Sequence, residues 1–240
     1  MRGVDEIDLR HENERLERAS AEERLGFAVE RYGTKTLFTS SFGAGSGVLL
    51  HLWSKVAPKL PVVFIDTGFL FDETLEYRDD LVARLGLTLL VVKPEIPRAE
   101  FMATHGDDIQ RLNADFCCGK NKVEPIAPLK RDAEAWVSGI RRDQSADRAG
   151  VPILLAVDGE PLKVHPIATF TAEDVHEYLR ANAIPPHPLE RRGYRSIGCE
   201  PCTRSVRPGE DERAGRWAWT EKTECGLHTD SLVRGNRGAA

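Results

Sequence analysis

Short apolar runs alternate with longer amphipathic ones near the start of the chain, and this alternation constrains the fold more than any other feature. The runs at 36–40, 61–66 and 87–92 predict strands, and the segments 48–56 and 72–85 between them predict helices. The order strand–helix–strand–helix–strand is typical of a parallel sheet with helices on both faces. We therefore predict an α/β fold: a single domain with a mostly parallel, twisted sheet flanked by helices.

The rest of the chain is less regular. The charged segment 12–32 predicts one N-terminal helix, and residues 98–131 predict helix in several pieces. Thr171, with Asp174 three residues later, predicts a capped helix over 171–182. The Pro-, Gly- and Arg-rich segment that follows predicts ordered loop, and the last 25 or so residues predict a mobile tail. Further strands are predicted at 135–139 and 153–157.

Charge and hydropathy exclude several classes of protein. The chain has 240 residues with 33 Lys and Arg against 38 Asp and Glu, a net charge of −5 that argues against bulk nucleic-acid binding. Its apolar runs are far shorter than the roughly 20 residues that cross a membrane. The N-terminus is polar and has no apolar signal segment. We expect a cytoplasmic protein whose partners are neither nucleic acid nor membrane.

A loop rich in Gly and Ser follows the first predicted strand. Residues 40–47 read Ser-Ser-Phe-Gly-Ala-Gly-Ser-Gly and lead into a helix. Glycines let the backbone turn its N–H groups toward an anion, and the N-terminus of a helix adds partial positive charge. The loop is neither a Walker loop nor a dinucleotide fingerprint. By itself it fits an ordinary turn as well as an anion site.

The five cysteines divide into four and one. They are Cys117, Cys118, Cys199, Cys202 and Cys225. An odd number in a reducing compartment argues against a disulfide framework. Four soft thiolates suit zinc or an iron–sulfur cluster. A vicinal pair is poor geometry for one ion but can reach two irons, so the spacing favours [4Fe–4S] and leaves zinc open.

Six motifs together resemble one known family. In chain order they are Ser41–Ser46, Asp66–Thr74, Cys117–Lys122, Trp136–Ser145, Gly198–Arg204 and Glu224–His228. This set is similar to the assimilatory adenylyl-sulfate (APS) reductases, the iron–sulfur branch of the PAPS/APS reductase family in the PP-loop superfamily. The resemblance divides the chain into an N-terminal helical segment, a PP-loop reductase domain that carries the cluster, and a tail with the catalytic cysteine, at 1–34, 35–205 and 206–240.

The resemblance implies a thioredoxin-dependent oxidoreductase that converts APS to sulfite and AMP in sulfate assimilation and cysteine biosynthesis. Cys225 would be the nucleophile, forming an S-sulfonate that a thioredoxin or a glutaredoxin-like reductant releases. The other four cysteines would ligate a [4Fe–4S] cluster. A homo-oligomer is left open. Weaker expectations give His228 a role in proton transfer, and Val63 and Gly139 contacts with adenine. The expected substrate-binding residues are Ser40, Ser41, Gly43, Ser46, Asp66, Lys122, Gly139, Arg141, Arg142, Arg213 and Arg216.

Three residues depart from the family pattern, and three other functions stay open. Phe42 and Gly45 stand where PP-loop enzymes have Gly and Asp, and Asn121 stands where Arg is more usual. The missing acid argues against the first alternative, an ATP-dependent ligase or tRNA-sulfur transferase. The second is the same reductase reaction on the 3′-phosphorylated nucleotide, PAPS. The third is a cluster-bearing regulator, which would have little use for Cys225.

Overall fold

The short apolar runs form a six-stranded sheet in the order β3-β2-β1-β4-β6-β5. This is a computed structural model, and it describes residues 8–227. Neighbouring strands are parallel except for β5, which is antiparallel to β6. The predicted fold class is confirmed, with one unpredicted strand, β6, that is too short to show periodicity. The strands are β1 (Thr36–Thr39), β2 (Val62–Ile65), β3 (Leu89–Val92), β4 (Ala135–Val137), β5 (Leu154–Leu155) and β6 (Leu162–Val164).

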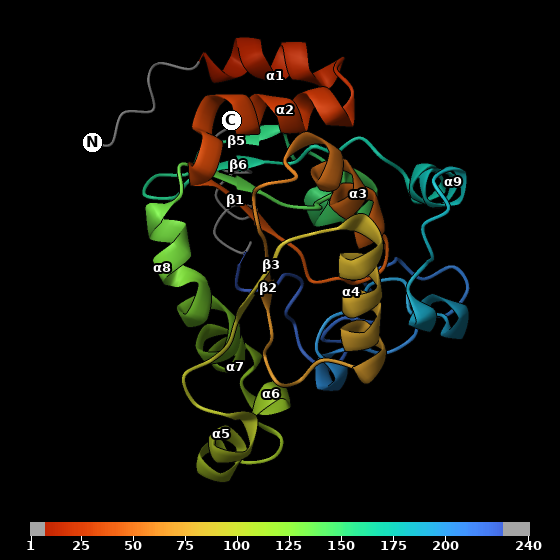
Figure 1. Ribbon diagram of the computed structural model, residues 1–240. Helices are drawn as coiled ribbons and strands as arrows, with labels where there is room; N and C mark the ends of the chain where they lie inside the picture. The colour runs from red at the N-terminus through yellow and green to blue at the C-terminus, as the bar shows by residue number, and fades with distance from the viewer. Residues whose placement is uncertain (1–7, 228–240) are drawn as a thin grey trace.

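Helices cover both faces of the sheet because side chains alternate along each strand. Phe38 of β1 packs in the main core with helices α2 (Ala21–Tyr32), α3 (Ser46–Val56), α4 (Asp72–Leu85) and α9 (Ala172–Ala181). The adjacent Leu37 packs on the opposite face against Ile126 of α8 (Glu124–Asp132). Figure 1 shows α8 on one side of the sheet and α3 and α4 on the other.

The N-terminal segment contains two helices, so the prediction of one helix over 12–32 is wrong. α1 (Leu9–Glu17) ends before Ser20, which caps the start of α2. The hydroxyl of Ser20 accepts a hydrogen bond from the Glu23 amide, and the Glu23 carboxylate accepts one from the Ser20 amide. This capping box ends one helix and begins the next.

The predicted helical pieces of 98–131 are present. They are α5 (Arg98–His105), α6 (Ile109–Leu112), α7 (Ala114–Cys118), a π-helical turn (Gly119–Val123) and α8. The wider π-helical turn joins α7 to α8 without a break. It therefore links the vicinal cysteines directly to the face of the sheet that α8 covers.

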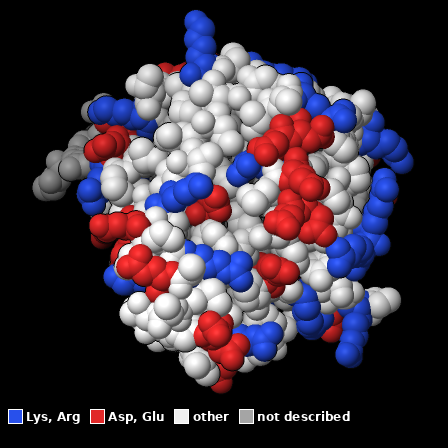
Figure 2. Space-filling view, turned by 60° about the horizontal axis from the view of Figure 1, so that its bottom comes forward, with Lys and Arg blue, Asp and Glu red and all other residues white. Residues whose placement is uncertain are grey.

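The described part of the tail forms no helix or strand, and both backbone hydrogen bonds, such as that from the Trp217 amide to the Cys202 carbonyl, and side-chain contacts pack it onto the domain. Short 3₁₀ turns at Pro188–Arg192 and Glu200–Cys202 precede it, and Trp217 is buried. Leu227 packs with the core on the α8 side. No helix within residues 8–227 is both long enough and apolar enough to span a membrane. Basic and acidic side chains are interspersed on the face shown in Figure 2.

Candidate functional site

A cavity of about 200 Å³ lies at the carboxyl ends of the central strands. Its walls include the residues that follow β1 and β4, and the end of β2. β1 pairs with β2 on one side and with β4 on the other, so the chain order reverses direction at β1. Open α/β sheets bind ligands at such a switch point.

The loop after β1 forms one wall of this cavity. Gly45 has a left-handed backbone (φ 73°) and directly precedes α3. A Cβ on Gly43 would lie 2.8 Å from the Ile197 carbonyl oxygen, so only glycine permits this close approach. The Ser46 hydroxyl, on the first residue of α3, is buried and has no hydrogen-bond partner within the described part of the chain. Ser40, Ser41, Gly43 and Ser46 all line the cavity, and the donor at Ser46 suits an anion.

Basic side chains line the cavity from several elements. They are Lys122, Arg141, Arg148, Arg195, Arg213 and Arg216. Acidic partners hold three of them: Arg141 binds Asp143 and Glu212, while Arg148 and Arg213 both bind Glu224. Sequence reasoning missed Arg148 and Arg195, because neither lies within a recognised motif.

The structure does not bring Arg142 and Asp66 into the cavity. The Arg142 guanidinium binds the Glu17 carboxylate of α1, at 2.5 and 2.9 Å, and the Val151 carbonyl. The Asp66 carboxylate accepts a hydrogen bond from the Gly68 amide, 3.0 Å away, in a local turn. Arg141 has extended backbone and Arg142 begins a 3₁₀ turn, so the two adjacent side chains diverge and only Arg141 lines the cavity.

The two residues expected to contact adenine are also separated. Gly139 lines the cavity, whereas Val63 is buried in the core beneath α8. His228, expected to assist proton transfer, lies outside the described residues.

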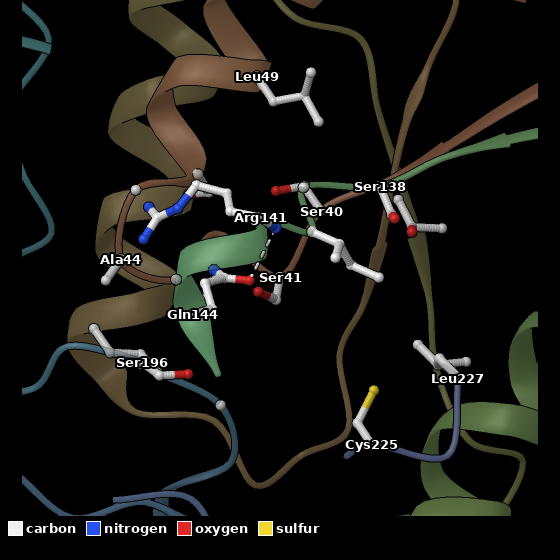
Figure 3. Close-up of a pocket in the computed structure, with 18 of the residues that line it drawn as sticks. Ser40, Ser41, Ala44, Leu49, Ser138, Arg141, Gln144, Ser196, Cys225 and Leu227 are labelled. Carbon is white, nitrogen blue, oxygen red and sulfur yellow. Dashed lines mark hydrogen bonds between the residues drawn. The ribbon is translucent and has the colours of Figure 1, made fainter. Parts of the chain in front are cut away.

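Cys225 lines the same cavity. Its sulfur points into the cavity, below Ser41 and Ser138 (Figure 3). The preceding residue, Glu224, is buried, and its carboxylate accepts a hydrogen bond of 2.9 Å from the Cys225 amide. The last described part of the tail thus places a thiol against the carboxyl ends of the strands.

The other four cysteines surround a second, smaller cavity. It is lined by Cys117 and Cys118 from α7 and by Cys199 and Cys202 from the turn after Gly198. Two polar side chains support the sulfurs. The Thr67 hydroxyl lies 3.3 Å from the Cys199 sulfur. The Asn121 amide nitrogen donates to the Cys117 sulfur, at 3.7 Å, and to the Cys117 carbonyl oxygen, at 3.0 Å. Within residues 8–227 no group of three or more His, Cys, Asp or Glu side chains has the spacing to hold a metal ion.

The donor chemistry of this second cavity nevertheless fits a thiolate-bound cluster. Burial, reinforced by the neighbouring cysteines, raises the pKa of Cys117 to about 11 and that of Cys202 to about 12. Four thiolates there therefore require positive charge close by. Burial alone would lower the pKa of Lys122, but Cys199, Cys118 and Cys225 outweigh it and raise that pKa above its ordinary value. Soft sulfur donors with a charged lysine beside them suit iron and sulfide.

Lys122 connects the two cavities. It lines the larger one, together with Cys225, and the smaller one, together with the four cysteines. It lies on the π-helical turn, four residues after Cys118. A charge at this position acts on both an anion in the larger cavity and the thiolates in the smaller one.

Comparison with known proteins agrees with this arrangement. Residues 35–205 match the family described as the phosphoadenosine phosphosulfate reductase domain. The chain is 43% identical over 233 residues to the adenosine 5′-phosphosulfate reductase of Chelativorans sp. (strain BNC1), covering 95% of this chain and 93% of that protein. It is 38% identical over 230 residues to the phosphoadenosine 5′-phosphosulfate reductase of Gloeobacter violaceus, covering 94% and 95%.

A solved structure shares the architecture. The crystal structure of phosphoadenylyl-sulfate (PAPS) reductase from Candida auris, a phosphate complex, superposes with a TM-score of 0.72 at 28% identity. The match covers 82% of this chain and 98% of that one. The likeness therefore extends over nearly the whole of that enzyme.

Proposed function

The chain belongs to the phosphoadenosine phosphosulfate reductase domain family, and we propose that it reduces adenosine 5′-phosphosulfate to sulfite and AMP in sulfate assimilation. One observation carries the proposal: Lys122 borders both the cavity that holds the Cys225 thiol and the cavity of the four cysteines. A nucleophile, an anion pocket and a set of soft metal ligands are thereby joined in one site.

In the first half-reaction the Cys225 thiolate attacks the sulfur of the phosphosulfate anhydride. An S–S bond forms, the bond from sulfur to the bridging oxygen breaks, and AMP leaves with that electron pair. The loop at 40–46 would bind phosphate, and Lys122, Arg213 and Arg216 would offset the charge that develops on the leaving oxygen. Arg216 is well placed for this, since its Nε is buried without a partner within the described chain.

In the second half-reaction a thioredoxin or glutaredoxin-like dithiol regenerates the enzyme. One of its thiolates attacks the Cys225 sulfur and sulfite leaves, and its second thiol resolves the mixed disulfide. The dithiol is oxidised by two electrons, and the substrate sulfur is reduced by two. Both electrons therefore come from thiols.

We assign Cys117, Cys118, Cys199 and Cys202 as ligands of a [4Fe–4S] cluster. When bound, the cluster would supply a fixed charged group beside the substrate pocket, and it need not change oxidation state during turnover. Lys122 would be held between the cluster ligands and the substrate anion. The lysine is a compact point charge, which suits a position that faces two anions.

A mass-spectrometric experiment tests the nucleophile. Wild type mixed with APS, without reductant, is expected to gain one SO₃ group on Cys225. Cys225→Ser should lose all sulfite production while it still binds nucleotide and keeps its iron, because serine has nearly the same shape as cysteine and Cys225 does not line the cavity of the other four cysteines. Equal sulfite production by the two proteins would disprove the assignment.

Reduction of PAPS is the second candidate, favoured by the similarity to the Gloeobacter violaceus relative. The two substrates differ only in a 3′-phosphate. Values of kcat/KM for APS and PAPS, measured with the same reductant, separate the two functions. We expect APS to be the better substrate, since the cysteine quartet is typical of that branch.

A further inference from the structure

Glu224, the residue before the nucleophile, is enclosed by two arginines that come from different parts of the chain. The Nε and Nη2 atoms of Arg148 lie 2.8 and 2.6 Å from its Oε2 atom. The Nη2 atom of Arg213 lies 2.8 Å from its Oε1 atom. Side-chain exposure is only 7% for Glu224, 6% for Arg148 and 10% for Arg213.

The Glu224 carboxylate holds this part of the tail in place through its ion pairs with the two arginines. A buried carboxylate is stable only when its oxygens are paired, and here both oxygens of Glu224 have partners. Burial would raise the pKa of Glu224, but Arg213 and Arg148 lower it below its ordinary value, so the group is ionised. Arg148 is held in turn by Gln144, whose side-chain oxygen accepts from it. The carboxylate also accepts from the amide of Cys225 itself, so the ion pairs orient the nucleophile's backbone.

The position of Cys225 requires this hold to open once in each cycle. Its sulfur points into the cavity, where it can reach a small nucleotide (Figure 3). A dithiol on another protein cannot enter a cavity of about 200 Å³. The two half-reactions therefore need opposite positions of the same sulfur.

Building on the proposed function, we infer that the Arg148–Glu224–Arg213 cluster is a latch. Closed, it holds Cys225 in the cavity for capture of the sulfonate; opened, it releases the modified cysteine to the protein reductant. Glu224 and Arg148 are then positioning residues. All three residues of the cluster line the cavity, so the latch closes beside the site where the nucleotide would bind.

Leu227 is a second attachment of the tail on the other side of Cys225, because it packs with the core beneath α8. Loss of the latch is therefore expected to loosen the tail rather than detach it. This limits the expected effect to about tenfold, the equilibrium change that corresponds to one charge-assisted hydrogen bond.

The first test measures access to the Cys225 sulfur in the iron-loaded enzyme without nucleotide. Alkylation by iodoacetamide is followed by mass spectrometry across a pH series, and the plateau rate at high pH is used because the thiol is then fully ionised in every variant. Glu224→Gln should raise this plateau by about tenfold. The matched control is Glu221→Gln, which removes an exposed carboxylate from the same tail and should leave the rate unchanged. Arg148→Gln should raise the rate as well, and it replaces Glu224→Gln if that variant does not fold.

The second test separates positioning from general damage. Glu224→Gln should slow sulfonation of Cys225 by APS, while sulfite release from the sulfonated variant by reduced thioredoxin is as fast as in wild type or faster. Glu224→Asp, which keeps the charge, should recover part of the first rate. Alkylation plateaus within about twofold of wild type in both latch variants, or equal slowing of both half-reactions, would overturn the latch. Failure of wild type to form the S-sulfonate would instead overturn the proposed function, because alkylation is measured without nucleotide.

Discussion

At the scale of single residues, Phe42 shows how this chain tolerates a departure from the usual loop. Its backbone is left-handed (φ 50°), a conformation that costs a residue with a Cβ about 1–2 kcal/mol. The ring is fully buried and meets Phe64 edge-on, with ring centres 5.5 Å apart. Burial of a phenylalanine side chain contributes about 1.5–3 kcal/mol, which offsets the strain. The loop therefore keeps its shape without glycine at this position.

Gly198 supports a prediction at the same scale. A Cβ at this position would lie 2.2 Å from Nη2 of Arg216, so Gly198→Ala should push the guanidinium out of the cavity. We expect kcat/KM for APS to fall by about tenfold or more, the worth of one charge-assisted hydrogen bond. Steady-state kinetics check this against Gly150→Ala, where a Cβ meets no atom within 4 Å. Equal kinetics for the two variants would remove Arg216 from the substrate site.

At the scale of elements, the continuous run from α7 through the π-helical turn to α8 positions both cavities. α7 carries two of the four clustered cysteines, the turn carries Lys122, and α8 is anchored to the sheet by Ile126. A wide turn inside a helix re-aims side chains without ending the helix. The spacing between the vicinal cysteines and Lys122 is therefore set by one element that is held firmly against the sheet.

The contact between α4 and the 3₁₀ turn at Pro188–Arg192 makes the stability of the fold depend on pH. His187 caps the turn at Pro188–Arg192 and pairs with the Thr74 hydroxyl of α4, and burial lowers its pKa to about 4 from an ordinary 6.5. The unfolded chain therefore binds this proton as pH falls through 6.5, whereas the folded chain binds it only near pH 4. His187 should thus reduce the free energy of unfolding by about 2 kcal/mol between pH 7 and pH 5.

Urea denaturation at the two pH values checks this effect. His187→Asn should show a weaker loss of stability on acidification than wild type. His11→Asn, at an exposed position on α1, should retain the full loss. The idea fails if the buried and the exposed variant respond to acid alike.

At the scale of the whole molecule, the site is assembled from segments far apart in the chain. The loop at 40–46, the vicinal cysteines, the turn around Cys199 and the tail at Cys225 meet around Lys122. Strand pairing places the first of these at the carboxyl ends of the central strands, and an isolated bridge joins Cys199 to Leu70, which follows β2. The chemistry therefore depends on the complete fold.

Loss of one clustered cysteine tests this dependence. Cys202→Ser should lose iron and lower the melting temperature, because the proposed cluster would join Cys199 and Cys202, in the C-terminal third of the chain, to α7. Iron analysis and calorimetry on anaerobically purified protein provide the measurement, with Cys225→Ser as the control that keeps its iron. Zinc instead of iron in the wild type, or full iron in Cys202→Ser, would contradict the ligand assignment.

Patterns in the amino-acid sequence were enough to predict the α/β class, most of the strands and longer helices, and the family. These depend on local periodicity, on caps such as Thr171 before α9, and on motifs that stay recognisable in one dimension. Short or interrupted elements could not be predicted in this way. β6 has three residues, and the break between α1 and α2 depends on a hydrogen-bonded pair, Ser20 and Glu23, rather than on hydrophobicity.

Which charged side chains face the site could be learned only from the three-dimensional fold. Arg141 and Arg142 are adjacent and equally basic, yet one lines the cavity and the other binds α1. Arg148 belongs to no motif, yet it holds Glu224, the residue before Cys225. Hydrophobic periodicity along the sequence indicates which side chains are buried. The partner of a buried charge depends instead on which distant segments the fold brings within hydrogen-bond distance.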